Sequence, residues 1–249
     1  KINQGISFNR NLAIEEAKGK YIAMIDGDDL ALPERLEKQL VFLEKNPDWR
    51  WLNYGNKSLW YPSIKLFKQV EYGNIEEVRN AITERTAGIL VEPIQGEGGL
   101  KFAGWNYLKE LSELAKEKGI LLLLDEVQCG AGRTGNFSGF HWAEIQPDII
   151  ALAKGIGGGF PVGATLFGKS TKDVITIGSH GTTFGGNPLA MAVTNAVCKE
   201  ISKPEFLKNV QVQSKNINEM LNNLMQKFPH IIKEIRGFGL MTGFMLHEE

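Results

Sequence analysis

Two short apolar runs, each followed by a residue able to do chemistry, constrain this chain more than any other feature. They span Ile120–Leu124 and Ile149–Leu152, with Asp125 directly after the first run and Lys154 just after the second. Both runs are too short and too continuously apolar for an amphipathic helix, so they predict buried strands of a mainly parallel sheet. Side chains at the carboxyl ends of such strands face one crevice. The sequence therefore predicts an α/β fold in which Asp125 and Lys154 meet.

A lysine and a carboxylate in one crevice suit pyridoxal phosphate. This cofactor requires a lysine that holds its aldehyde as a Schiff base, and a carboxylate that keeps its pyridine nitrogen protonated. Asp125 and Lys154 supply both groups. An ordinary surface ion pair explains the two residues equally well when they are considered alone, so the surrounding residues must decide.

Four ordered motifs surround these residues and favour the cofactor site. They read EPIQGEGG from Glu92, DEVQCGAGRTG from Asp125, PDIIALAKGIGGG from Pro147 and HGTTFGGNP from His180. In order and spacing they resemble the class III pyridoxal-phosphate aminotransferases, from about Gly55 to the C-terminus. The resemblance implies the large domain of fold-type I transferases, in which helices flank a mainly parallel sheet. It also implies amino transfer between N-acetylornithine and 2-oxoglutarate, in arginine biosynthesis.

The resemblance assigns roles to individual residues. Lys154 corresponds to the lysine that carries the cofactor and moves a proton, and Asp125 to the partner of the pyridinium nitrogen. Gln128 corresponds to a side chain near the ring's phenolic oxygen, for which loop capping is the alternative. Glu97 corresponds to a glutamate that restrains a substrate-reading arginine of the C-terminal domain. Glu92 lines the substrate pocket or is structural.

Two threonines extend the expected site across a subunit interface. Thr183, with Thr182 beside it, corresponds to the threonine that reaches the cofactor phosphate of a neighbouring subunit. Hydroxyls and loop amides can bind a phosphate through hydrogen bonds, although a simple turn is the alternative. The resemblance thus implies a homodimer that takes an amino acid and a 2-oxo acid as substrates.

Residues 1–50 follow a different pattern and resemble a fragment of a family 2 nucleotide-sugar glycosyltransferase. Asp26 and Asp28 come directly after the apolar run Tyr21–Ile25. Such a pair can hold Mn²⁺ or Mg²⁺ against a diphosphate, and an acidic turn before a helix is the alternative. The expected organisation is a glycosyltransferase-like fragment at 1–50, a seam at 51–58, an aminotransferase large-domain portion at 59–235 and the start of a truncated small domain at 236–249.

Three functions stay open. We favour amino transfer. The alternatives are that the chain is a metal-dependent glycosyltransferase or a non-catalytic chimeric fragment. The family's N-terminal phosphate cradle and its ring-stacking aromatic residue have no counterpart before Gly55, so we expect the chain alone to be a poor catalyst or none.

Composition and charge limit the binding partners and the compartment that we expect for this chain. A net charge of -1 leaves no excess of positive charge that would attract nucleic acid or an anionic membrane. No apolar run approaches the roughly 20 residues of a membrane span. Cys129 and Cys198 form neither a CxxC motif nor a disulfide framework, which favours a reduced cytoplasmic setting.

Periodicity predicts the remaining elements. Strands are expected at 67–70, 87–91 and 162–167, and a last strand at 239–246. Helices are expected at 75–83, 105–118, 188–201 and 206–228. The buried side of the last helix should consist of Phe206, Val210, Ile217, Leu221, Leu224 and Phe228.

Overall fold

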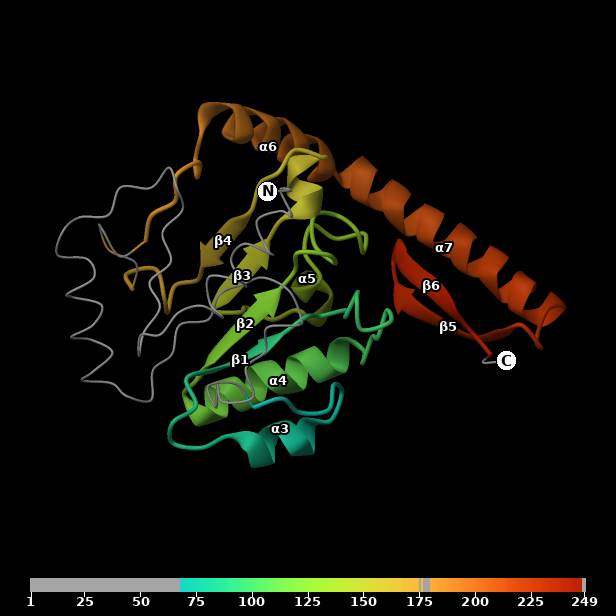
Figure 1. Cartoon of the computed structure of the whole chain (residues 1–249), viewed down its shortest axis with the longest axis horizontal. Coiled ribbons are helices and arrows are strands. Elements are labelled where there is room, and N and C mark those ends of the chain that lie inside the picture. Colours follow the sequence, from blue (N-terminus) through green and yellow to red (C-terminus); the bar gives the residue numbers. More distant parts are fainter. Residues whose placement is uncertain (1–67, 175, 177–179, 248–249) are drawn as a thin grey trace, which may run out of the picture. The chain divides into compact units, whose positions relative to one another are not determined.

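The computed structural model describes residues 68–174, 176 and 180–247, and residues 69–249 form one compact unit. The main sheet of this unit has four strands in the order β1-β2-β3-β4 (Figure 1). Strands β1 (Gly88–Val91), β2 (Leu121–Asp125) and β3 (Ile149–Leu152) run parallel, and β4 (Ala164–Phe167) runs antiparallel to β3. The predicted α/β fold with a mainly parallel sheet is confirmed.

Helix α4 (Trp105–Lys118) connects β1 to β2 and packs on the sheet. It has the predicted bounds because Gly119 ends it in the left-handed conformation, with φ of 65°, and donates its N–H to the last turn. Apolar residues at helical spacing on α4 meet Leu122 and Leu124 of β2 in the largest core cluster. Their removal from water is the main favourable term in the stability of this layer.

Two predictions about strands need correction. The run 87–91 was expected to be a buried strand, yet Leu90 of β1 is 51% exposed and the other residues of β1 are only partly buried. The four residues of β4, for which a strand but no burial was predicted, are exposed. Among the described residues, β1 and β4 form the edges of the sheet, so each has one neighbouring strand there and fewer side chains pack against it. The strand predicted at 67–70 is wrong for residues 68–70, which have no regular structure.

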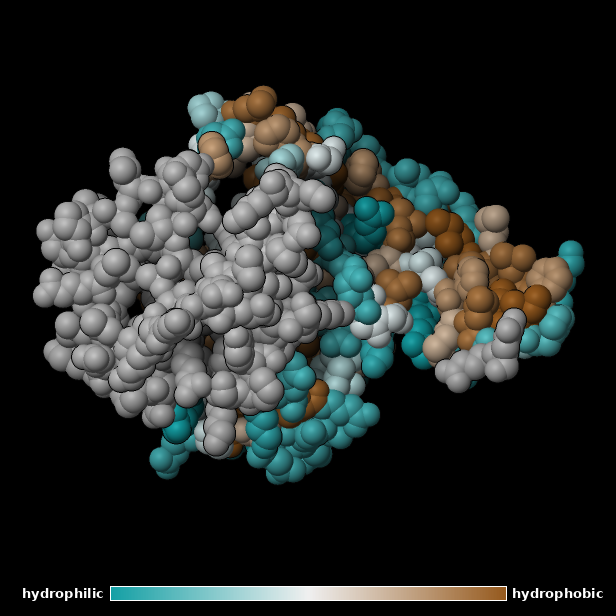
Figure 2. Space-filling view, in the orientation of Figure 1, coloured by the Kyte–Doolittle hydropathy of each residue, from teal (hydrophilic) through white to brown (hydrophobic). Residues whose placement is uncertain are grey.

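The C-terminal part consists of α6 (Pro188–Ile201), α7 (Pro204–Lys227) and a hairpin of β5 (Ile232–Phe238) and β6 (Met241–Leu246). Both helices were predicted, as was β6, but β5 was not. The predicted buried side of α7 is buried only at Val210. Apolar residues such as Met220 and Phe244 stay exposed, and Figure 2 shows this surface over α7 and the hairpin. None of the described helices could span a membrane.

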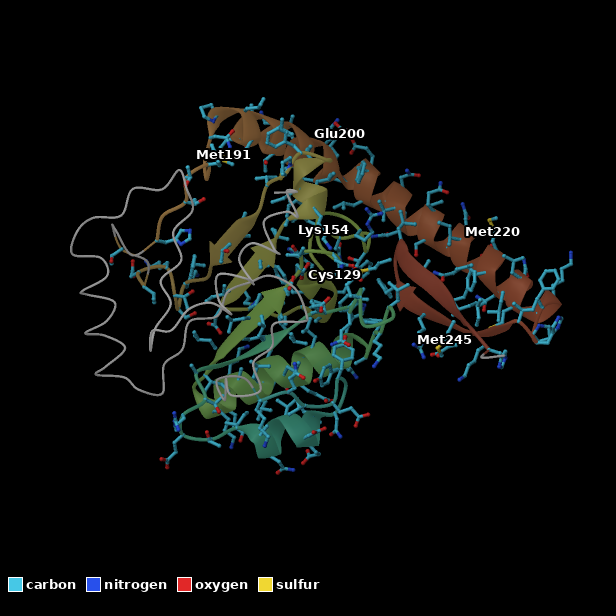
Figure 3. The ribbon with its side chains drawn as sticks, in the orientation of Figure 1. Cys129, Lys154, Met191, Glu200, Met220 and Met245 are labelled. Atoms are coloured by element: carbon cyan, nitrogen blue, oxygen red, sulfur yellow. The ribbon has the colours of Figure 1, made fainter. Side chains whose placement is uncertain are left out.

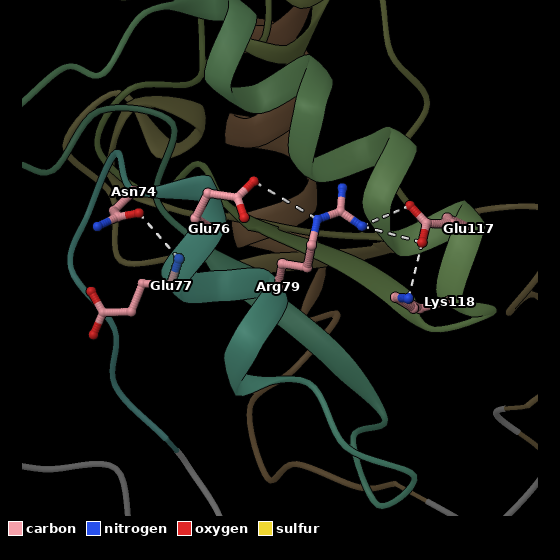
Figure 4. A network of polar contacts seen from close by, with 6 residues as sticks. All are labelled: Asn74, Glu76, Glu77, Arg79, Glu117 and Lys118. Atoms are coloured by element: carbon pink, nitrogen blue, oxygen red, sulfur yellow. Dashed lines mark hydrogen bonds and ion pairs between the residues drawn. The ribbon is translucent and has the colours of Figure 1, made fainter.

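Helix α3 (Ile75–Ala81) begins with a side-chain cap that offers a test of the fold (Figure 4). Asn74 Oδ1 accepts a hydrogen bond of 3.1 Å from the Glu77 N–H, and Arg79 of the same helix forms an ion pair of 3.0 Å with Glu117 of α4. Asn74→Ala is expected to lower the free energy of unfolding by about 1 kcal/mol, because the amide of Glu77 loses its acceptor. Urea denaturation measures the change, and Asn80→Ala, inside the same helix, is the control. Equal midpoints for the two variants would contradict the assignment of the cap.

Candidate active site

Parallel pairing of β2 with β3 brings the two predicted site residues to the same edge of the sheet. Asp125 is in register with Ala151, and the chain continues from Ala151 through the end of β3 to Lys154. Figure 3 shows Lys154 and Cys129, from the segments after β3 and β2, at the same end of the sheet. The strand ends therefore bring Asp125 and the segment of Lys154 to the same edge of the sheet, as the two apolar runs predicted.

The pKa of Glu92 is shifted by charged side chains at the ends of the neighbouring strands. Glu92 follows β1, is half-buried and accepts a hydrogen bond of 3.3 Å from the Gly96 N–H. Burial is the main cause that raises the pKa of Glu92; the nearby carboxylates of Asp125 and Glu97 raise it further, and the Lys154 amine lowers it. Glu92, Asp125 and Lys154, at the ends of β1, β2 and β3, are therefore close enough to interact electrostatically.

Gln128 contacts another residue of the predicted site. Its Nε2 donates a hydrogen bond of 3.2 Å to Glu97 Oε1. A Cβ atom on Gly96 would overlap the amide of Gln128 in this conformation, so Gln128 lies close to the backbone of the segment 92–97. The structure brings Gln128, Glu97 and Glu92 together through the segment 92–97.

Lys154 has an unusual backbone conformation for a lysine. It begins the 3₁₀ helix η2 (Lys154–Gly157) with φ of 46°, in the left-handed region that non-glycine residues seldom adopt. Such strain collects at functional sites. Its side chain is exposed, and none of the ion pairs within the described part of the chain includes Lys154 or Asp125. The alternative of an ion pair between these two residues is therefore wrong.

A cavity of about 360 Å³ opens beside Lys154. Gln128 and Arg133 line it from the segment after β2, and Leu240, Met241 and Thr242 line it from the hairpin. That the hairpin forms one wall of this cavity was not predicted. Asp125, Glu92, Thr182 and Thr183 are not among the lining residues.

Glu126 is a buried acidic residue that the sequence interpretation did not single out. It is 1% exposed, and its carboxylate accepts hydrogen bonds of 2.7 and 2.9 Å from the N–H groups of Gly139 and Phe140, at the start of α5 (Phe140–Ala143). Burial raises the pKa of Glu126 to about 7 despite these hydrogen bonds. Glu126 thereby ties the end of β2 to α5, next to Asp125.

Several predicted residues lie elsewhere. Thr182 and Thr183 are exposed in the segment before α6. Asp26 and Asp28 lie outside the described residues, so the metal site stays a prediction. Within the described ranges, no group of three His, Cys, Asp or Glu residues could hold a metal ion.

Comparison with known proteins agrees with this geometry. The family model "Aminotransferase class-III" matches residues 46–249, which begins earlier than the expected boundary at Gly55. The chain is 49% identical over 182 residues to the acetylornithine aminotransferase of Brucella melitensis, covering 73% of this chain and 45% of that protein. It is 44% identical to the corresponding enzyme of Methanocaldococcus jannaschii, covering 74% and 46%.

Solved structures give the same result. The N-acetylornithine aminotransferase of Stenotrophomonas maltophilia K279a superposes with a TM-score of 0.66 at 35% identity, covering 73% of this chain and 47% of that one. The ornithine aminotransferase of Toxoplasma gondii ME49 gives 0.69 at 33% identity, with 73% and 44% covered. This chain spans under half the length of these relatives. From its fold, its motifs and these matches, the chain belongs to the class III aminotransferases.

Proposed function

We propose that this chain is the large-domain portion of a pyridoxal-phosphate-dependent aminotransferase that exchanges an amino group between N-acetylornithine and 2-oxoglutarate. The observation that carries the proposal is the parallel pairing of β2 and β3, which brings Asp125 and Lys154 to one edge of the sheet. The names of the relatives at 44–49% identity support acetylornithine as the amino donor, and 2-oxoglutarate rests on the resemblance of the motifs.

The residues at the strand ends fit the cofactor chemically. Lys154 offers an exposed amine without an ion-pair partner in the described chain, and Asp125 offers a half-buried carboxylate. When bound, pyridoxal phosphate supplies a ring that accepts the electrons of a substrate carbanion. The two groups that must act on opposite ends of this ring are therefore present.

Each residue then has a definite task. The Lys154 Nζ would hold the aldehyde carbon of the cofactor and would act as the base for the proton on the substrate α-carbon. The Asp125 carboxylate would accept a hydrogen bond from the protonated pyridine nitrogen, and the Gln128 side chain would lie near the phenolic oxygen of the ring. Glu92 and Glu97 belong to the substrate side.

The proposal includes a second subunit, whose cofactor phosphate is bound by threonines of this chain. Thr182 and Thr183, which are exposed in the segment before α6, would bind the phosphate of the partner's cofactor in a cytoplasmic homodimer. Metal-dependent glycosyl transfer through Asp26 and Asp28 stays a prediction, for which manganese-dependent binding of a nucleotide sugar is the test.

Covalent trapping tests the proposed function. The chain is mixed with pyridoxal phosphate and reduced with borohydride, and the labelled peptides are identified by mass spectrometry. We expect one stoichiometric label on Lys154, because its amine has no ion-pair partner in the described chain and its side chain lines the cavity. Labelling spread over exposed lysines such as Lys172, with no preference for Lys154, would count against the proposal.

A further inference from the structure

The cavity beside Lys154 is positively charged. Two cationic side chains line it, Arg133 and Lys154, and the described residues of the lining include no aspartate or glutamate. Apolar side chains, from Leu100, Leu240 and Met241, form other parts of the wall. Its volume of about 360 Å³ lies within the range of small-molecule sites, about 300–1,000 Å³. Cationic groups beside an apolar wall suit a small aliphatic carboxylate.

The backbone of Arg133 is held firmly while its side chain stays available. The Arg133 N–H donates to the Gly130 carbonyl at 3.3 Å, and the Arg133 carbonyl accepts from the Leu240 N–H at 3.0 Å. The neighbouring Thr134 hydroxyl accepts a hydrogen bond of 3.2 Å from the Trp142 indole. The backbone around Arg133 is therefore fixed before any ligand arrives.

The guanidinium of Arg133 has no protein partner in the described part of the chain. It is exposed, it takes part in no ion pair, and no side-chain hydrogen bond involves it. The arginine Arg236, by contrast, is paired with Glu234 at 2.7 Å. A planar guanidinium can donate two parallel hydrogen bonds to one carboxylate, which gives both affinity and orientation.

We propose that Arg133 binds a carboxylate of the amino-acid or 2-oxo-acid substrate in the cavity that Lys154 also lines. The inference rests on the proposed function, because it places a substrate next to Lys154. The apolar wall from Leu100 and Met241 then contacts the aliphatic part of the substrate. Arg133 is thus a residue of this chain that contributes to substrate specificity.

Calorimetric binding of glutarate to the full chain without pyridoxal phosphate tests this inference. Glutarate carries two carboxylates on an aliphatic chain but has no amine or keto group that could react. We expect Arg133→Gln to weaken binding at least tenfold and Arg133→Lys to weaken it less, because lysine keeps the charge and loses the fork of donors. Arg79→Gln, which removes an arginine that is paired with Glu117 on the α3 surface, should bind like the wild type.

The outcomes separate this inference from the proposed function. Glutarate that does not bind the wild type, or that binds Arg133→Gln equally well, overturns the role of Arg133. If circular dichroism shows that Arg133→Gln is unfolded, Arg133→Lys decides, and affinity equal to the wild type overturns the inference. Binding that depends on Arg133 without a borohydride label on Lys154 overturns the proposed function instead.

Discussion

Lys154→Ala is expected to remove the visible absorbance that the wild-type chain gains with pyridoxal phosphate. The variant keeps the fold but has no amine to hold the aldehyde carbon, and no other lysine lines the cavity in the described chain. Any amino transfer that the wild type supports should fall at least ~100-fold, since the proton at the substrate α-carbon loses its base. Absorbance titration and an amino-transfer assay measure the two effects.

Because the backbone at position 154 is in the left-handed region, Lys154→Gly is a useful second variant. Alanine at φ of 46° keeps the strain of the wild type, whereas glycine relieves it. Lys154→Gly should therefore melt at or above the temperature of Lys154→Ala and should lack the absorbance equally. Lys172→Ala, which removes an exposed lysine, is the control and should retain the absorbance. An unchanged spectrum in both Lys154 variants would show that another residue holds the cofactor.

Glu126→Gln is expected to flatten the dependence of stability on pH. Burial raises the pKa of the Glu126 carboxyl from 4.5 to about 7 in the folded chain. The folded chain holds this proton more tightly than the unfolded chain, so the stability from Glu126 is fully present below pH 4.5 and is lost as the pH rises through about 7. A shift of this size corresponds to roughly 3 kcal/mol.

Urea denaturation at several pH values between these limits measures the effect. The free energy of unfolding of the wild type should fall by roughly 3 kcal/mol more than that of Glu126→Gln over the window. Glu113→Gln, which changes an exposed glutamate of α4, should keep the slope of the wild type. The same slope in Glu126→Gln and the wild type would contradict the assignment.

Local signals account for the elements that were predicted well. Helix α4 ends where Gly119 ends it, and α6 begins where Asn187 caps the Ala190 N–H and Pro188 follows. Strand β5 escaped prediction because Ile232, Ile235 and Phe238 recur every three residues, and a register shift after Ile232 interrupts the alternation. The exposure of β1 and β4 depends on strand order, which periodicity does not encode.

The site was predictable where it depends on strand ends and unpredictable where it depends on long-range contacts. The positions of Asp125 and Lys154 at two strand ends followed from two apolar runs that form a parallel pair. Glu126 continues the alternation of Leu122 and Leu124 by one residue, so its burial could have been read from the strand pattern. The wall formed by Leu240 and its neighbours could not, because the contact joins segments about a hundred residues apart and has no local signal.

The protonation state of the pyridine nitrogen tests most directly the claim that Asp125 and Lys154 act on one ring. Pyridoxal phosphate labelled with ¹⁵N is bound to the wild type and to Asp125→Asn, and the nitrogen chemical shift is recorded by NMR. We predict a protonated nitrogen in the wild type and an unprotonated one in Asp125→Asn, with the label still on Lys154 after reduction in both. An identical shift in the two proteins would contradict the account.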